Sequence, residues 1–162
     1  LENNYKKYIY DKLGIQSTYL FQPGMEFNFP GVWYQGKIYK VPNILATVGA
    51  SGGIVSTKTD NMKFIKAFFN GELFSKDYMK VMMEQYRSLQ FFPMQYGTGI
   101  MRFKMPGSPQ LIGHSGSTGT LCYYSPQYQI YITGSINECN EVKSTQIAAE
   151  LANCFAYEGE GQ

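Results

Sequence analysis

Apolar side chains follow a helical repeat at the start of the chain. Over residues 1–13 they recur every three or four positions, at Tyr5, Tyr8, Ile9 and Leu13. This spacing places them on one face of an α-helix. Gly14 follows directly, and glycine readily takes the left-handed conformation that ends a helix. The pattern predicts a helix that ends at Gly14.

Residues 15–50 show no sustained period. They contain three of the seven prolines of the chain together with several glycines, and both residue types interrupt regular structure. We expect a long, ordered and mostly irregular segment. Five aromatic side chains are expected to pack it down, namely Phe21, Phe27, Phe29, Trp33 and Tyr39.

A helical pattern returns in the next segment. Thr57 followed three positions later by Asp60 resembles a capping box, and Asn70-Gly71 is a stop signal. The apolar positions between them repeat at helical spacing, at Met62, Ile65, Phe68 and Phe69. A second helix is predicted from a Ser75 cap to about Tyr86. One side of it is expected to hold Tyr78, Met82 and Met83.

The last third of the chain changes to short runs of β-branched and aromatic residues. Turn residues separate four such runs, at residues 96–105, 110–120, 121–125 and 129–137. The short connection through Pro126 predicts an antiparallel hairpin between the last two runs. A closing helix is predicted over residues 142–157. Its buried stripe is expected at Ile147, Leu151, Cys154 and Phe155.

Composition places the chain among globular proteins. It has 162 residues, of which 44% are hydrophobic and 16% are charged, enough for one domain with a hydrophobic core. The formal net charge is +2 and neither sign is gathered into a run, so no electrostatic footprint for nucleic acid or an anionic membrane is visible. No apolar stretch approaches the ~20 residues that span a bilayer. Because the sequence opens at Leu1 without a targeting segment, we expect a piece of a longer chain.

Metal and redox chemistry find little support in the sequence. The three cysteines show no Cys-x-x-Cys spacing, which argues against a zinc knuckle, a redox pair or a disulfide scaffold. We interpret all three as small buried apolar side chains, at Cys122, Cys139 and Cys154. The single histidine offers no zinc-ligand spacing either. We therefore expect neither a metal nor a cofactor.

The most unusual stretch is residues 113–119, Gly-His-Ser-Gly-Ser-Thr-Gly, which holds the only histidine among three glycines and three hydroxyls. Glycine-rich backbone permits the close approach of a ligand. One interpretation is a strand whose backbone groups pair with a substrate while His114 or a hydroxyl forms a further hydrogen bond. The alternative is a strand-to-turn transition whose hydroxyls satisfy the loop. A phosphate loop is excluded because the Gly-x-x-x-x-Gly-Lys pattern is absent.

The order of signals along the chain is more specific than any single one. In sequence they are Lys12-Leu13-Gly14-Ile15 with Thr18-Tyr19, Ala50-Ser51-Gly52-Gly53 entering a helix through Asp60, Asn70-Gly71-Glu72-Leu73, Tyr96-Gly97-Thr98-Gly99, residues 113–119, and Tyr124-Ser125-Pro126 followed by Ile130-Tyr131-Ile132. This order resembles the C-terminal half of the class C-like serine β-lactamase and penicillin-binding-protein superfamily. The resemblance covers essentially the whole chain.

The resemblance implies an acyl-transfer reaction. In that family the serine of Ser-x-x-Lys attacks a carbonyl, its lysine and the tyrosine of Tyr-x-Asn move protons, and a Lys/His-x-Gly strand lines the other wall. His114-Ser115-Gly116 matches this third motif, and with Ser117 it gives the expected substrate-binding residues. The first two motifs are absent, since Ser56-Thr57-Lys58 has the wrong spacing to place both groups on one helical face. No catalytic residue is assigned, and this chain alone should be inert.

The resemblance also implies a fold. It is an α/β (α+β) sandwich, a partial β-lactamase/transpeptidase-like fold with an antiparallel sheet, terminal helices on one face and a helical region. Of a five-stranded sheet, this chain is expected to supply three strands. Residues 1–162 are a single domain or fragment, with residues 1–95 mostly helical and irregular and residues 96–162 forming the strands and last helix. Ser135-Ile136-Asn137 lies on what resembles the last core strand, behind the site, and is interpreted as structural.

These expectations lead to a functional hypothesis. The chain is the C-terminal portion of a bacterial serine hydrolase that acts outside the cytoplasmic membrane on a lactam, a peptide or an ester. The alternative is a non-catalytic module that binds a peptidoglycan-like peptide or a protein. The strand over residues 129–137 should leave one edge free, so the expected partner is the N-terminal half of the parent enzyme or a second copy of this chain. No nucleic-acid partner is expected.

Overall fold

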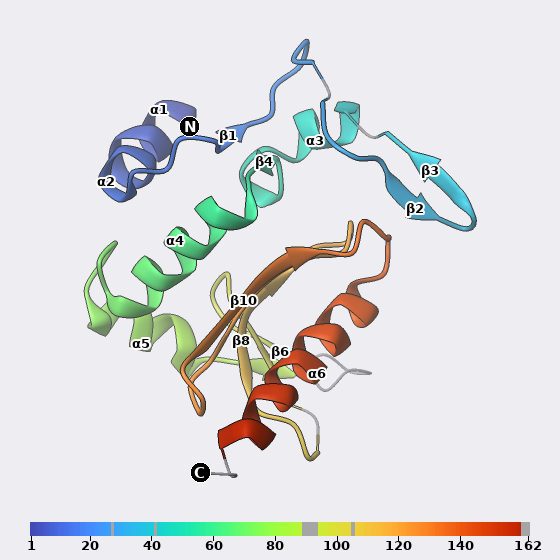
Figure 1. The fold of residues 1–162 in the computed structure, drawn as a ribbon. Helices are drawn as coiled ribbons and strands as arrows, with labels where there is room; N and C mark the ends of the chain where they lie inside the picture. Colours follow the sequence, from blue (N-terminus) through green and yellow to red (C-terminus); the bar gives the residue numbers. More distant parts are fainter. Residues whose placement is uncertain (27, 41, 89–93, 105, 160–162) are drawn as a thin grey trace.

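The computed structural model describes residues 1–26, 28–40, 42–88, 94–104 and 106–159. Its centre is an antiparallel sheet in which the strands follow each other in chain order, with a helix on each face (Figure 1). The six strands of this sheet are β5 (Arg87–Ser88), β6 (Met94–Tyr96), β7 (Met101–Phe103), β8 (Leu111–Ser115), β9 (Thr120–Ser125) and β10 (Ile130–Ser135). The expected α/β sandwich with an antiparallel sheet is confirmed.

The sheet contains more strands than expected. Three were implied by the resemblance, and the described residues form six. The predicted run over residues 96–105 is in fact interrupted by a turn in which the Gly97 N–H donates to the Ile100 carbonyl at 2.7 Å. On the side of β8 away from β9, the sheet therefore extends through β7, β6 and β5. The predicted hairpin is confirmed, because β9 and β10 pair antiparallel over their full length.

One face of the sheet packs against the last helix, α6 (Glu141–Gly159). Between them lies the hydrophobic core, in which Phe103, Leu111 and Tyr123 are almost fully buried. The helix turns its small side chains to the strands, at Ser144, Thr145, Ala148, Ala149 and Ala152. Small residues let the helix lie close enough for the large strand residues to fill the interface.

The predicted buried stripe of this helix was therefore wrong. Leu151, Cys154 and Phe155 are exposed, and Ile147 is only half-buried. Ranking positions by hydrophobicity selected the wrong face, because close packing on a sheet depends on side-chain size as well as on polarity.

The other face of the sheet is covered by α4 (Lys58–Asn70). The helix begins as predicted, with the Thr57 hydroxyl accepting a hydrogen bond from the Asp60 N–H at 3.2 Å. It ends at Gly71, whose φ is +77°. The Phe69 ring lies 4.6 Å, centroid to centroid, from the ring of Tyr124 on β9. These contacts fix α4 across β9 and β10.

The second tandem helix, α5 (Lys76–Glu84), is shorter than predicted. Its buried residue is Met79; of the three side chains predicted on this side, Met82 and Met83 are half-buried and Tyr78 is exposed. Ser75 does precede the helix, but its side chain forms no capping hydrogen bond.

The N-terminal helix is confirmed. It runs without a break through α1 (Glu2–Tyr5), a π-helical segment η1 (Lys6–Tyr10) and α2 (Asp11–Leu13), and it ends at Gly14 with φ +60°. The buried Asp60 carboxylate then accepts hydrogen bonds from the Ser17 N–H at 2.8 Å and the Thr18 hydroxyl at 3.0 Å. Asp60, in the first turn of α4, therefore also holds the N-terminal segment in place.

The segment over residues 15–50 is more regular than predicted. It contains β1 (Tyr19–Leu20), which pairs with β4 (Ile54–Val55), a hairpin of β2 (Val32–Tyr34) and β3 (Lys37–Tyr39), the helix α3 (Pro42–Val48) and a 3₁₀ turn η2 (Gly49–Ser51). Phe21 is buried and meets Phe29 edge to face, so these two rings pack as expected. Trp33 and Tyr39 are exposed, so they do not pack the segment down. Phe27 lies outside the described residues.

The sequence pattern does not predict this hairpin, because its turn residues resemble loop composition. Gln35 and Gly36 both have positive φ, at +49° and +77°, which is the geometry of a type I′ turn between two strands. Glycine is needed at the second position. Within the described ranges, no helix is both long and apolar enough to cross a bilayer.

Gly113 is predicted to be required for the pairing of β8 with β9. A Cβ atom there would lie 2.8 Å from Tyr123 Cα and still closer to the Cys122 carbonyl oxygen. We expect Gly113→Ala to lower the free energy of unfolding by at least about 2 kcal/mol through this overpacking. Urea denaturation followed by circular dichroism measures the change.

Gly134→Ala on β10 is the matched control, because the nearest atom to its Cβ would be Leu121 Cδ1 at 4.0 Å. We expect a change of less than about 1 kcal/mol. Equal effects of the two substitutions would show that the close approach at Gly113 is not a constraint.

Candidate functional site

His114 lies at the end of β8, beyond the last residue pair that joins this strand to β7. That pair is Met101 with Gly113, and the next residue on β8 is His114. The imidazole is exposed, and its Nε2 lies 2.6 Å from the hydroxyl of Tyr96 on β6. The two rings meet edge to face with centroids 5.6 Å apart. Tyr96 therefore reaches across the end of β7 and holds the histidine ring.

The second ring nitrogen fixes the tautomer. Nδ1 lies 2.6 Å from the carbonyl oxygen of Ser115, and a carbonyl can only accept a hydrogen bond. In the neutral imidazole the proton must therefore be on Nδ1, which leaves Nε2 to accept the hydrogen bond from the Tyr96 hydroxyl. The phenolic oxygen can still accept a hydrogen bond. The pair therefore offers a hydrogen-bond acceptor, the Tyr96 hydroxyl oxygen, and behind it a proton acceptor, His114 Nε2.

The other predicted substrate-binding residues take different positions. Ser115 is buried, and its hydroxyl contacts Thr145 Oγ1 at 3.3 Å and Met101 Sδ at 3.8 Å, so its side chain faces the core. Gly116 is in a tight turn, donating to the Thr120 carbonyl and accepting from the Gly119 N–H, both at 2.9 Å. Ser117 is exposed at the tip of this turn. Of the four, the side chains of His114 and Ser117 are accessible.

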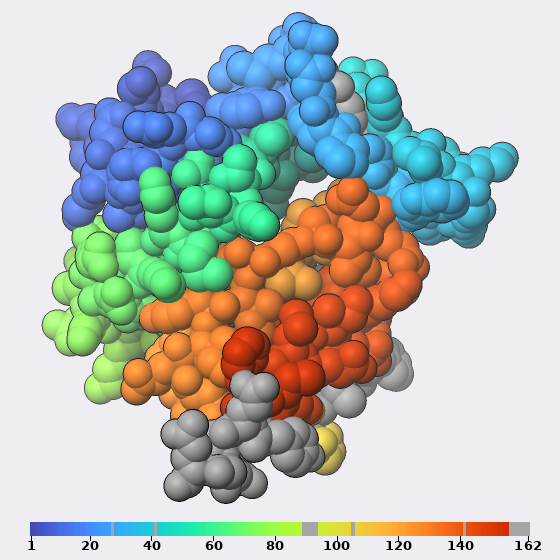
Figure 2. All heavy atoms as spheres, in the orientation of Figure 1, coloured from blue at the N-terminus to red at the C-terminus, as the bar shows by residue number. Residues whose placement is uncertain are grey.

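A cavity of about 230 Å³ lies beside this turn. Hydroxyl and amide groups line one side of it, at Ser56, Thr118, Thr120, Ser135 and Asn137, and apolar side chains line the other, at Phe29, Pro30, Val32, Leu45, Ile54 and Val55. Thr120 is two residues from Cys122, the pairing partner of His114, and therefore lies on the same face of the sheet. Figure 2 shows the surface hollowed where the orange strand ends meet the N-terminal segments.

Ser135 and Asn137, which the sequence pattern predicts behind the site, line the same cavity as Thr118 and Thr120. Ser135 Oγ accepts from the Asn137 N–H at 3.1 Å and contacts Asn137 Oδ1 at 3.0 Å. They belong to the same surface as the 113–119 turn.

Cys122 is the cysteine that could form a pair with the histidine, since it stands directly opposite His114 on β9. Burial raises the pKa of its thiol to about 12. The thiol is therefore protonated at neutral pH and is not a nucleophile. Cys122 is half-buried, whereas Cys139 and Cys154 are exposed, so the prediction of three buried cysteines was wrong for two of them.

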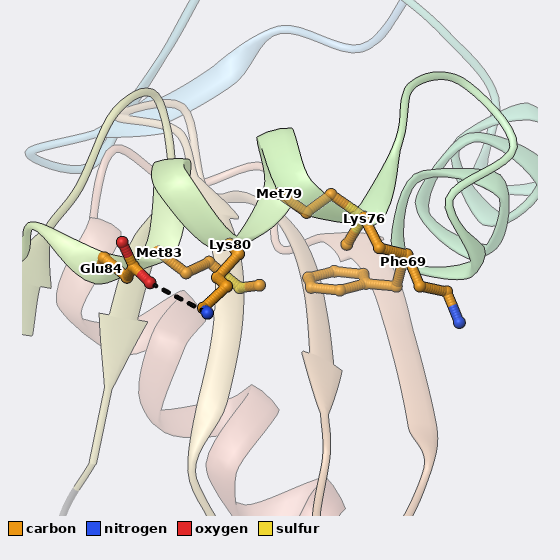
Figure 3. A pocket seen from close by; sticks show the side chains of 6 residues that line it. All are labelled: Phe69, Lys76, Met79, Lys80, Met83 and Glu84. Carbon is orange, nitrogen blue, oxygen red and sulfur yellow. Dashed lines mark ion pairs between the residues drawn. The ribbon is translucent and has the colours of Figure 1, made fainter.

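A second cavity, of about 360 Å³, lies between α4 and α5 (Figure 3). Its lining residues are Phe69, Lys76, Met79, Lys80, Met83 and Glu84. The floor is apolar, and at the rim Lys80 pairs with Glu84 at 3.7 Å in an exposed position. The residues that line it include neither a hydroxyl nor an imidazole. No cluster of three metal-ligating side chains occurs among the described residues.

Sequence reasoning missed Tyr96 and the hydroxyls of the cavity. Tyr96 was noted only as part of Tyr96-Gly97-Thr98-Gly99, and its contact with His114 depends on where β7 ends. Ser56 reaches the cavity because its hydroxyl is hydrogen-bonded to Thr18 at 2.7 Å, next to the β1–β4 pair. No local pattern carries either piece of information.

Comparison with known proteins gives one family and one fold. The family model for beta-lactamase matches residues 1–156. No curated protein matches the chain. Among solved structures, a D-amino acid amidase from Ochrobactrum anthropi SV3 complexed with D-phenylalanine has a TM-score of 0.78 and 15% identity, over 97% of this chain and 52% of that one.

Two further solved structures share the fold. A D-stereospecific amidohydrolase from Streptomyces sp. has a TM-score of 0.72 and 19% identity, over 91% of this chain and 47% of that one. A penicillin binding protein from Bacillus halodurans has a TM-score of 0.68 and 16% identity, over 93% and 49%. The chain spans about half the length of these structures.

Proposed function

The chain belongs to the beta-lactamase family, and on that premise we propose that it forms one wall of the active site of a bacterial serine hydrolase. The observation that carries this proposal is the position of His114, which is exposed just past the end of β7 and held through both ring nitrogens. A histidine held in this way can exchange a proton with the Tyr96 hydroxyl, and through it with a reacting carbonyl.

The substrate we propose is the carbonyl of an amide, either a peptide or a lactam, with an ester as the third possibility. Two of the similar structures are a D-amino acid amidase and a D-stereospecific amidohydrolase, and these names favour an amide next to a D-configured residue. The cavity beside the 113–119 turn fits such a molecule, because its apolar side suits a side chain and its hydroxyls suit the polar backbone.

The nucleophile has to come from elsewhere. Ser-x-x-Lys and Tyr-x-Asn are both absent from the 162 residues, so this chain orients a carbonyl but has no serine activated by a neighbouring lysine. We propose that a segment carrying Ser-x-x-Lys faces His114 across the cavity. As in the family generally, the assembled enzyme would act outside the cytoplasmic membrane.

The free edge of β10 is the proposed attachment point for that segment. Among the described residues no strand pairs with its outer side, and the sequence from Gln127 to Asn137 carries no charge that would block pairing. The absence of Ser-x-x-Lys also supports a second candidate function, a non-catalytic module in which the same cavity binds a peptidoglycan-like peptide.

The purified chain is expected to be catalytically silent. With no activated serine, a chromogenic cephalosporin and a p-nitrophenyl ester should be hydrolysed no faster than in buffer. Spectrophotometric turnover assays check this. Stoichiometric acylation by a fluorescent penicillin, mapped by mass spectrometry to a serine of this chain, would overturn the proposal.

His114→Ala is expected to reduce activity once a Ser-x-x-Lys segment is present. In such an enzyme kcat/KM should fall by about ten- to a thousandfold, because one hydrogen-bonding group beside the acyl centre is lost. Stability should change little, since the imidazole is exposed. Gln127→Ala, in the exposed turn at the opposite end of the sheet, is the control and should keep full activity. An unstable His114→Ala protein with undiminished activity would assign the histidine a structural role.

The free edge predicts self-association of the chain. Size exclusion with light scattering should show oligomers that grow with concentration. Ser135→Lys puts a charge on the edge strand and should shift the distribution to monomer, whereas Thr120→Lys, its partner on the interior strand β9, should not. A stable monomer whose amides are protected from hydrogen exchange throughout residues 130–135 would contradict the prediction.

A further inference from the structure

Exposed apolar side chains are concentrated in one part of the molecule. Of the large hydrophobic residues that are exposed, seven lie between residues 25 and 54, at Met25, Trp33, Tyr34, Ile38, Tyr39, Ile44 and Ile54. Four of these belong to the β2–β3 hairpin, which projects from the body of the molecule (Figures 1 and 2). Large exposed apolar surface on a projection is typical of an interaction site.

The hairpin presents apolar side chains on both faces. Trp33 and Ile38 are directly paired and share one face, with exposed fractions of 49% and 59%. On the other face the rings of Tyr34 and Tyr39 meet edge on at 6.2 Å, with 48% and 45% exposed. A hairpin that buried one face on the domain would show one polar and one apolar side. This hairpin instead has exposed apolar side chains on both faces.

Trp33 ties the hairpin to the segment that follows β10. The Trp33 N–H donates to the Asn137 carbonyl at 2.7 Å, and the Cys139 N–H donates to the Trp33 carbonyl at 2.8 Å. The positive φ values of Gln35 and Gly36 close the tip in a two-residue turn. The projection is therefore a defined β structure, and its orientation relative to β10 is fixed by backbone hydrogen bonds.

Charge on and around the hairpin has one sign. The sequence from residue 27 to residue 59 contains no aspartate or glutamate, whereas Lys37 begins β3 and Lys40 follows it. The carboxylate near the base, on Glu138, is paired with Lys143 at 2.5 Å. The Glu138–Lys143 pair adds no net negative charge, so the hairpin carries an uncompensated charge of two lysines.

We propose that the β2–β3 hairpin places its exposed aromatic and aliphatic side chains in the surface of a lipid bilayer that contains anionic lipids. Tryptophan and tyrosine combine an apolar ring with a polar group and favour the boundary between headgroups and hydrocarbon. Lysines beside them reach the negative headgroups.

Trp33 makes the proposal directly measurable, because it is the only tryptophan in the chain. On titration with vesicles of equimolar phosphatidylglycerol and phosphatidylcholine, its emission should shift to shorter wavelength. Phospholipids brominated in the acyl chain should quench it. Pure phosphatidylcholine vesicles should give a much weaker response. Since no other residue emits as tryptophan, adhesion through another apolar surface would leave the signal unchanged.

Matched variants separate the hairpin from general stickiness. Lys37→Gln with Lys40→Gln should lower the partition coefficient about 30-fold, and Ile38→Asn about tenfold. The controls on α5, Lys76→Gln with Lys80→Gln and Val81→Asn, remove the same charge and a similarly exposed side chain, and should leave it unchanged. Circular dichroism of each variant verifies the fold, and the lysine variant keeps the test valid if Ile38→Asn disturbs the hairpin.

Two results would overturn the proposal. One is co-sedimentation of the chain with vesicles while Trp33 stays unquenched by brominated lipid, which would place the contact elsewhere. The other is a blue shift of Trp33 that grows with protein concentration in the absence of lipid, which would identify a second copy of the chain as the occupant of this surface.

Discussion

A short chain of buried hydroxyls decides which way the strand carrying His114 faces. Tyr123 Oη and Thr145 Oγ1 lie 3.1 Å apart, and Thr145 contacts Ser115 Oγ at 3.3 Å, all three between α6 and the sheet. A buried hydroxyl without a partner is costly, and these contacts remove that cost, so Ser115 can lie on the core side together with the fully buried Leu111. Because side chains alternate along a strand, its neighbour His114 must point to the opposite face. The orientation of β8 that buries Ser115 therefore also makes the histidine accessible.

Local signals predicted the elements well and their orientation poorly. The Thr57 cap, the Gly14 and Gly71 stops and the β9–β10 hairpin are each fixed by a few neighbouring residues, and all were correct. The face of α6 was wrong because Leu151 and Phe155 look like core residues in isolation. Their exposure is decided by the sheet opposite, which accepts only small side chains. That information is spread over β8, β9 and β10.

The candidate site shows the same division. The sequence pointed to residues 113–119 through their glycines, hydroxyls and lone histidine. It did not reveal that Tyr96 holds the ring, because that contact exists only where β7 stops one residue short of His114. Nor did it separate Ser115 from Ser117, which are alike in the motif and opposite in burial. The sequence indicated which residues could carry chemistry, whereas the direction of each side chain depends on the pairing of the strands in the sheet.

The residues that hold His114 all belong to this chain. The positioning of the histidine therefore does not depend on the segment that would supply the nucleophile. Tyr96, the Ser115 carbonyl and the hydroxyls behind it fix the imidazole without any contribution from a nucleophile-bearing segment. An arriving Ser-x-x-Lys segment would therefore meet a wall already organised, and would lose entropy only for its own ordering. The same logic explains why the incomplete features are peripheral. The unpaired edge of β10 and the exposed side chains of α6 lie where a further segment can add without disturbing the hydroxyls that set the register.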